Sequence, residues 1–207
     1  MANQLLFVCA ANVCRSPLME ITFNDSEALG IDHSQWEVMS RGTSVVRENP
    51  MCELAASLSG RVARESHVSQ QLTESELGAQ DLIIVASREE RAHLARLLPS
   101  IRTRTFTLKE AVQLGAAMME AREVERSRVI EGERAAAGYA ALLNHRRGRT
   151  AAPHRPSIRA PWVQAADPHD IPDVHHGSPK NHANTLVQLR SLVRTVQRRI
   201  GEYIDSE

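Results

Sequence analysis

The sequence predicts an α/β fold in which helices flank both faces of a four-stranded parallel sheet. Two short apolar runs, at residues 4–10 and 80–87, have the length and composition of strands buried in such a sheet. Each leads into a segment with helical spacing, and the C-terminal stretch 180–204 carries apolar residues at the same spacing. Strands that alternate with helices along a chain form parallel sheets covered on both faces. We expect a single domain over residues 1–207.

The elements follow one another from the N-terminus in this alternation. After the strand at 4–10, Ser16 is the expected N-cap and Pro17 the first residue of a helix that ends near Gly30. The later elements are a strand at 36–40, a helix within 50–63, a strand at 80–87, a helix at 88–99, a strand within 103–108 and the final helix at 180–204.

The segment at about 111–160 interrupts the alternation, and we interpret it as a helical and basic-loop insertion. Residues 116–143 show an Ala/Glu/Arg helical pattern, and residues 144–161 are basic and irregular. A surface helix with a mobile loop is our interpretation, and a lid or docking surface near the site is the functional alternative. Residues 145–159 contain no aromatic side chain for stacking on bases, so we do not predict nucleic-acid binding.

Bulk properties limit the classes of partner. The formal net charge is +0 and the pI is about 7.1, so no global field attracts nucleic acid or an acidic membrane. We find no signal-peptide pattern and no apolar run of roughly 20 residues that would span a membrane. An odd count of three cysteines indicates a reducing compartment. We expect a cytoplasmic monomer or weak dimer with no nucleic-acid or membrane partner.

The stretch C-A-A-N-V-C-R-S, residues 9–16, stands between the first strand and the first helix. Ligands of open parallel sheets bind beyond the carboxyl ends of strands, where a helix N-terminus favours an anion and stabilises a thiolate. The five residues between Cys9 and Arg15 would surround a tetrahedral oxyanion with backbone N–H groups, and Arg15 would bind two of its oxygens. The pattern predicts that Cys9 is a nucleophile aimed at a phosphorus atom held by Arg15.

The chain resembles the low-molecular-weight protein tyrosine phosphatases, as a bacterial-type member with an insertion. The segment LLFVCAANVCRSPLME is similar to their signature C-x-x-N-x-C-R-S-P. VMSRGTS and ESHVSQQLTESELGAQDLIIVASREERAHL are similar to their second strand and central segment, and DIPDVHHGS stands where they carry D-P-Y-Y-G-N or D-P-[FYW]-G. The resemblance implies a phosphomonoester hydrolase, first of all a protein-tyrosine phosphatase, that works through a phosphocysteine intermediate. It needs no cofactor, and its substrate is a phosphorylated protein or a small phosphomonoester.

The resemblance also implies a role for each matching residue. Cys9 corresponds to the nucleophile, Arg15 to the group that binds phosphoryl oxygens, and Ser16 to the hydroxyl that hydrogen-bonds the thiolate. Asn12 corresponds to the residue that fixes the loop, for which its tolerance of the left-handed conformation suits it, and Ser40 to the serine that supports Asn12. The phosphate-binding loop comprises Ala10, Ala11, Asn12, Val13, Cys14 and Ser16.

Two aspartates compete for the role of general acid, and a third is a weaker candidate. Asp173 is our choice, because D-V-H-H-G-S reproduces the length and the glycine of D-P-Y-Y-G-N just before a helix that starts at Pro179. Asp167 keeps the D-P pair with Pro168 but lies six residues earlier. Asp170 is the third candidate and is more typical of a turn.

Several departures from the family pattern bear on the substrate. Val45 and Val46 replace the aromatic residue after the second strand, and His175 and His176 replace the Tyr pair. Val174 replaces the proline after the acid. Fewer aromatic side chains mean less stacking on a phenyl ring, so leaving groups other than tyrosine stay open.

Alternative activities depend on a few positions. Val13 is aliphatic as in tyrosine-type loops, whereas arginine phosphatases resemble these loops but carry Thr there, so phosphoarginine is disfavoured. Cys14 resembles the family's second loop cysteine, which can bond Cys9 on oxidation. Arsenate reduction on the same loop needs further cysteines and only Cys52 remains, so we rank it below phosphatase, together with a non-catalytic, phosphate-binding pseudo-phosphatase.

The acidic and histidine-rich stretch D-P-H-D-I-P-D-V-H-H has a composition that could hold zinc. Its possible ligands are His169, Asp170, Asp173, His175 and His176. Their spacing fits no structural zinc pattern, so we expect a solvated loop and no metal.

Overall fold

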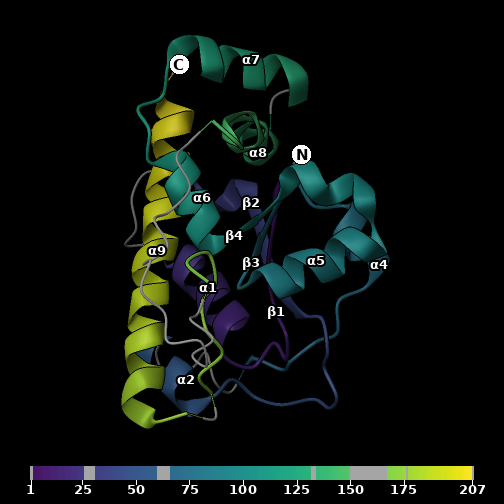
Figure 1. The fold of residues 1–207 in the computed structure, drawn as a ribbon, viewed down its shortest axis with the longest axis vertical. Helices are drawn as coiled ribbons and strands as arrows, with labels where there is room; N and C mark the ends of the chain where they lie inside the picture. The colour runs from purple at the N-terminus through teal and green to yellow at the C-terminus, as the bar shows by residue number, and fades with distance from the viewer. Residues whose placement is uncertain are drawn as a thin grey trace, which may run out of the picture.

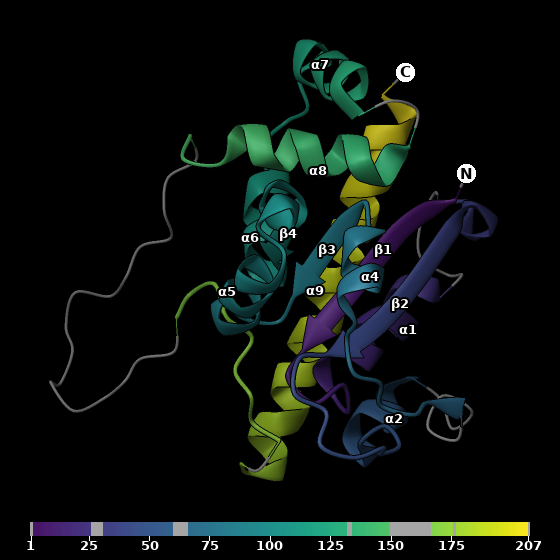
Figure 2. The ribbon, with the colours of Figure 1, turned by 90° about the vertical axis from the view of Figure 1, so that its right-hand side faces the viewer.

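The computed structural model of the chain describes residues 2–25, 31–59, 66–131, 134–149, 167–175 and 177–206. Its centre is a parallel sheet of four strands in the order β2-β1-β3-β4 (Figures 1 and 2). The strands are β1 (Asn3–Cys9), β2 (Trp36–Gly42), β3 (Leu82–Val85) and β4 (Thr105–Thr107). All three pairings are parallel, which confirms the predicted fold class.

The sheet separates two hydrophobic cores because side chains alternate along β1. Leu5 and Phe7 belong to the larger core, which also contains apolar side chains of α1 (Arg15–Asn24) and α9 (Pro179–Asp205). Leu6 and Val8 face the smaller core with residues of α4 (Glu74–Gly78) and α5 (Arg88–Leu97). Helices therefore cover both faces, as the sequence predicts.

The remaining described elements complete these layers. They are α2 (Glu53–Ser59), α6 (Leu108–Gly115), α7 (Ala121–Glu131), α8 (Ala135–Arg146), and the 3₁₀ turns η1 (His33–Gln35) and η2 (Pro99–Arg104). None of the described helices combines the length and apolar composition that crossing a bilayer requires.

The start of α1 differs from its prediction. The helix begins at Arg15 rather than at Pro17, and its N-cap is Cys14, which makes no side-chain capping bond. Ser16 is not the cap, because its hydroxyl is fully buried and lies 3.0 Å from the sulfur of Cys9. The helix ends at Asn24, and the predicted end at Gly30 lies outside the described residues.

The second strand is two residues longer than predicted. Arg41 and Gly42 continue the pairing of β2 with Val8 and Cys9, so the strand reaches the level of the phosphate loop. A Cβ on Gly42 would lie 2.7 Å from the carbonyl oxygen of Ala10. Glycine is therefore required where β2 passes this close to the loop.

The predicted surface helix over 116–143 is wrong, because the chain forms two helices there and one of them is buried. Helix α8 is buried along much of its length, including the small residues Ala136, Ala137, Gly138 and Ala140. The backbone N–H of Ala136 donates to Asn3 Oδ1 at 2.9 Å, so α8 lies at the amino end of β1, away from the phosphate loop (Figure 2). The described helices are thus no lid, and the basic loop beyond residue 149 lies outside the described residues.

Candidate active site

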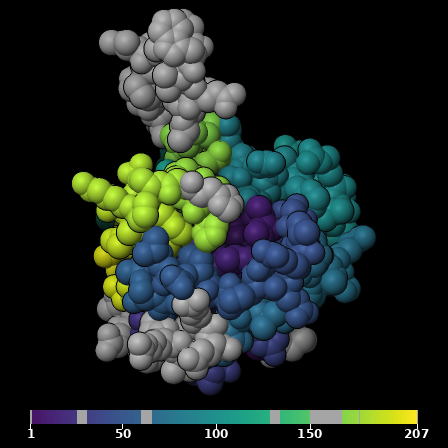
Figure 3. Space-filling view, turned by 90° about the horizontal axis from the view of Figure 1, so that it is seen from below, coloured from purple at the N-terminus to yellow at the C-terminus, as the bar shows by residue number. Residues whose placement is uncertain are grey.

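The phosphate loop runs from Cys9 at the end of β1 to Arg15 at the start of α1. Its carbonyl groups are bound by flanking segments: Cys9 O accepts from Thr43 N at 3.0 Å, and Val13 O accepts from Cys52 N at 2.9 Å. Figure 3 shows this end of the molecule, where purple N-terminal atoms reach the surface between blue atoms and the yellow-green atoms that begin near residue 167. The loop is therefore both held in shape and accessible.

The floor of the loop is a buried network of polar side chains. The hydroxyl of Ser16 lies 3.0 Å from Cys9 Sγ and can donate to it. Asn12 Nδ2 donates to Ser16 Oγ and to Ser40 Oγ, both at 2.9 Å, and Asn12 has φ 52°. Asparagine tolerates this left-handed conformation better than most residues. The structure thus brings together Cys9, Asn12, Ser16 and Ser40, as the resemblance to the family implies.

Arg15 closes the loop and is buried, with 7% of its side chain exposed. Its Nη1 donates to the carbonyl of Ile171 at 3.1 Å, and its Nη2 donates to Asp173 Oδ2 at 2.6 Å. Glu90 Oε1 lies 3.7 Å from Nη2 and is itself buried. The carboxylate of Asp173 is the accessible partner, with 55% of its side chain exposed.

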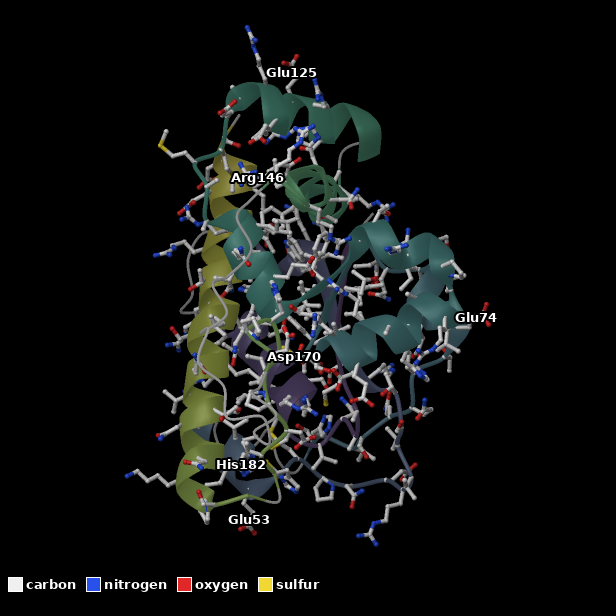
Figure 4. All side chains as sticks on the ribbon, viewed as in Figure 1. Glu53, Glu74, Glu125, Arg146, Asp170 and His182 are labelled. Atoms are coloured by element: carbon white, nitrogen blue, oxygen red, sulfur yellow. The ribbon has the colours of Figure 1, made fainter. Side chains whose placement is uncertain are left out.

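The acid loop, residues 167–175, places the three candidate acids differently. Asp167 pairs with the guanidinium of Arg88, and its side chain is 10% exposed. Asp170 Oδ1 accepts from the backbone N–H of Arg88 at 2.8 Å and so caps the start of α5 (Figure 4). Asp173 pairs with Arg15 itself, which is the position expected for a group acting at the loop.

Three further residues support the site, and the sequence did not predict a role for them. Glu90 holds Arg15 and also contacts the hydroxyl of Ser87. His67 Nε2 lies 2.8 Å from the carbonyl oxygen of Asn12, and Gln70 N donates to Asn12 Oδ1 at 2.9 Å. The sequence does contain a signal for Glu90, because Ser87 and Glu90 have the spacing of a capping box at the start of a helix.

A second group of side chains lies behind the loop, and we call it the sulfur–imidazole cluster: Cys14, Cys52, His175 and His182. Cys14 Sγ lies 2.9 Å from His182 Nε2. Hydrogen bonding with Cys52, and then burial, raise the pKa of the Cys14 thiol far above its usual range. Burial lowers the pKa of His182, and His175 adds to this effect. These residue types are typical ligands of zinc, in a set that the sequence did not reveal.

The surface beside the loop has aliphatic and polar walls, and it includes Cys52, His175 and His182 of the sulfur–imidazole cluster. Val46 is 97% exposed and covers nothing, and His176 lies outside the described residues. A hollow of about 370 Å³ adjoins the loop. It is lined by Val13, Asn49, Pro50, Met51, Cys52, Glu53, Leu54, His175 and His182.

A sequence model of low molecular weight phosphotyrosine protein phosphatases matches residues 4–126. The chain belongs to this family. The match includes the phosphate loop and the elements from β1 through α6, whereas the acid loop and α9 lie beyond it. Family members are cysteine-dependent phosphatases, so this protein is a cysteine-dependent hydrolase of phosphomonoesters.

Individual relatives agree with this membership. The probable low molecular weight protein-tyrosine-phosphatase AmsI of Erwinia amylovora is 30% identical over 108 residues, which are 51% of this chain and 71% of that protein. The protein-arginine-phosphatase of Bacillus subtilis is 30% identical over 112 residues, 52% of this chain and 71% of that protein.

Solved structures of similar fold extend over the C-terminal part as well. The low molecular weight protein tyrosine phosphatase from T. tengcongensis has a TM-score of 0.58 and 20% identity, over 94% of this chain and 97% of that one. The YwlE arginine phosphatase from Geobacillus stearothermophilus has a TM-score of 0.57 and 17% identity, over 98% and 93%. At these identities the likeness concerns the fold.

Proposed function

We propose that this protein dephosphorylates phosphotyrosine in proteins, with Cys9 as nucleophile, Arg15 as phosphoryl-binding group and Asp173 as general acid. The observation that carries the proposal is the arrangement of Arg15. Its buried side chain ends the loop that begins at Cys9, and its guanidinium is bound by a carboxylate that solvent reaches. A phosphoryl dianion would replace that carboxylate on the guanidinium and place its phosphorus over the sulfur.

The first chemical step follows from these positions. The thiolate of Cys9 attacks phosphorus, an S–P bond forms, and the bond from phosphorus to the leaving oxygen breaks. Protonated Asp173 gives its proton to that oxygen, which makes the leaving group a neutral alcohol. Arg15 and the loop N–H groups stabilise the equatorial oxygens of the transition state.

The second step reverses the roles. Water attacks the phosphocysteine, Asp173 accepts its proton, the S–P bond breaks, and inorganic phosphate and the Cys9 thiolate are released. The hydroxyl of Ser16, 3.0 Å from Cys9 Sγ, donates a hydrogen bond to the departing sulfur. Asn12 and Ser40 keep Ser16 in place for this step.

The choice of Asp173 over Asp167 is supported by what each carboxylate contacts. Asp167 is enclosed and paired with Arg88, a residue of α5 outside the loop. Asp173 is exposed and lies 2.6 Å from the guanidinium that we assign to the phosphoryl group. A proton donor must reach the leaving oxygen, and the exposed position of Asp173 beside Arg15 supports this role better than the enclosed position of Asp167.

The preference for phosphotyrosine over phosphoarginine is supported by the hollow beside the loop. Val13 lines it with an aliphatic side chain, and Met51 and Leu54 add further apolar surface. These apolar side chains suit an aryl ring, and the polar part of the lining consists of Asn49, Cys52, Glu53, His175 and His182. We further propose a monomer or weak dimer acting in the cytoplasm, which fits the presence of three cysteine thiols without a disulfide among them.

The test is hydrolysis of p-nitrophenyl phosphate and of matched phosphotyrosine and phosphoarginine peptides by the wild type and Cys9→Ser. We expect turnover of the nitrophenyl ester and the phosphotyrosine peptide by the wild type alone. Faster release of phosphate from the phosphoarginine peptide would overturn the substrate assignment. Binding of phosphate by a wild type without turnover between pH 5 and about 8 would indicate a pseudo-phosphatase.

A further inference from the structure

The sulfur–imidazole cluster draws its members from four separate segments that meet behind the phosphate loop. Cys14 ends the loop, Cys52 precedes α2, His175 belongs to the acid loop, and His182 lies in the first turn of α9. Figure 4 shows His182 at the same lower end of the molecule as Glu53, the neighbour of Cys52. One ligand atom from each of the four residues lies within 4.8 Å of every other.

These separations are close to those of a tetrahedral metal site. With Zn–S bonds of about 2.3 Å and Zn–N bonds of about 2.0–2.1 Å, ligand atoms at tetrahedral angles lie roughly 3.3–3.8 Å apart. Cys14 Sγ is 2.9 Å and Cys52 Sγ is 4.0 Å from His182 Nε2. These two separations, and the upper limit of 4.8 Å for the whole set, lie within about 1 Å of the tetrahedral values.

The charge and surroundings of the cluster also suit a divalent cation. Two thiolates would neutralise a 2+ ion, and two neutral imidazoles complete a Cys₂His₂ set. The backbone N–H of Ala55 points to Cys52 Sγ at 3.4 Å, an interaction that stabilises a metal-bound thiolate. Cys14 and His182 are buried whereas His175 is exposed, and the hollow of about 370 Å³ reaches Cys52 and both imidazoles. An ion therefore has an entry path to a partly buried site.

We propose that Cys14, Cys52, His175 and His182 form a zinc-binding site, in contrast to the expectation from the sequence that no metal is bound. The nucleophile Cys9 is not a member of this group, and its sulfur contacts Ser16. Bound zinc joins the loop, α2, the acid loop and α9. The backbone N–H of His175 donates to Asp173 Oδ1 at 3.2 Å, so a fixed His175 also restrains the proposed acid. Zinc also occupies Cys14, which then no longer bonds Cys9 on oxidation.

The experiment is a titration of chelator-treated, reduced protein with Co²⁺, followed by competition with Zn²⁺. We expect one equivalent of Co²⁺ to give the intense visible bands of tetrahedral cobalt and a near-ultraviolet thiolate-to-cobalt band, and Zn²⁺ to abolish both. Zinc should also raise the thermal midpoint of the wild type. Weak octahedral bands without the thiolate band would overturn the proposal.

Variants separate this site from the catalytic one. Cys52→Ser and His182→Gln should lose the thiolate-to-cobalt band or its tetrahedral signature, together with the stabilisation by zinc. His169→Gln, which changes an acid-loop histidine outside the cluster, should keep both. Cys9→Ser should lose turnover but bind cobalt normally. Loss of the thiolate band in Cys9→Ser would place the metal on the nucleophile and contradict the proposal, and wild-type cobalt spectra for both Cys52→Ser and His182→Gln would also contradict it.

Discussion

Two buried arginines at opposite ends of the sheet make the same kinds of contact for different purposes. Arg15, at the carboxyl end, is bound by one backbone carbonyl and by two carboxylates, of which Asp173 is exposed. Arg146, at the amino end (Figure 4), donates to the carbonyl groups of Leu114, Ala117 and Met118 and to Glu123. The backbone carbonyls of α6 and of the segment after it cannot leave, whereas an exposed carboxylate can be replaced. Arg15 is therefore available to a ligand, and Arg146 connects α6, α7 and α8.

Substitution of lysine for Arg15 tests the carboxyl end. A lysine keeps the charge but cannot make two parallel hydrogen bonds to phosphoryl oxygens. We expect kcat for nitrophenyl phosphate to fall by about 100-fold or more, with a small change in thermal midpoint. Arg88→Lys, at the neighbouring ion pair with Asp167, is the matched control and should stay near wild type. Near-wild-type kinetics for Arg15→Lys would show that Arg15 is as structural as Arg146.

Replacement of Asp173 by asparagine tests whether the exposed partner of Arg15 is the proton donor. Loss of the donor should slow phenyl phosphate by about 100-fold or more, because its leaving group needs a proton. An activated nitrophenyl ester should be affected far less. If Asp167→Asn shows this dependence on the leaving group and Asp173→Asn does not, the acid lies six residues earlier.

Replacement of Arg146 by methionine tests the amino end. Three carbonyls and a carboxylate lose their donor, and we expect a loss of about 3 kcal/mol in the free energy of unfolding. The thermal midpoint should fall by about 6–12 °C, measured by calorimetry, while kcat of the folded protein is unchanged. Arg122→Met, at an exposed site of α7, is the control. A fall in kcat without a fall in the thermal midpoint would contradict the structural role that we assign to Arg146.

Glu123→Gln gives a smaller effect that depends on pH. The hydrogen bond from Arg146 holds the pKa of Glu123 below its usual value of 4.5. A depressed pKa contributes stability that is complete above that value and is lost as pH falls through the lower folded-state pKa. We expect Glu123→Gln to lower the midpoint by about 2 °C at pH 7, and the difference from the wild type to shrink as pH falls through the folded-state pKa. A midpoint difference that persists in acid, or one equal to that of the exposed control Glu125→Gln, would contradict this account.

Local patterns made the carboxyl end predictable from the sequence. The phosphate loop is a continuous stretch between a buried strand and a helix, so its residues are adjacent in both sequence and space. The position of Asp173 followed from the length of one loop before α9, which begins at Pro179 as predicted. The four strands were predicted correctly because apolar runs in buried parallel sheets are continuous. The end of β2 was not, because Arg41 and Gly42 join the strand through their pairing with β1.

Other features depend on contacts between distant segments, which a local pattern does not contain. The burial of α8 results from close packing against α9, where a Cβ on Gly138 would lie 2.3 Å from the hydroxyl of Tyr203. The sulfur–imidazole cluster combines Cys14 and Cys52 with two histidines more than 120 residues later, a spacing that matches no zinc motif. Glu90 likewise reaches Arg15 only through the fold.

Our mechanism requires a phosphocysteine at Cys9 during turnover. This intermediate can be trapped and located in the protein. Asp173→Asn mixed with an activated phosphate ester and quenched in acid should retain a phosphoryl group on part of the protein, because hydrolysis of the S–P bond also needs the acid. We predict that mass spectrometry of the digest places this group on the sulfur of Cys9 and that Cys9→Ser shows no thiol-bound phosphate. Phosphate on Cys14, or steady turnover with no phosphorylated protein and full activity in Cys9→Ser, would contradict the account.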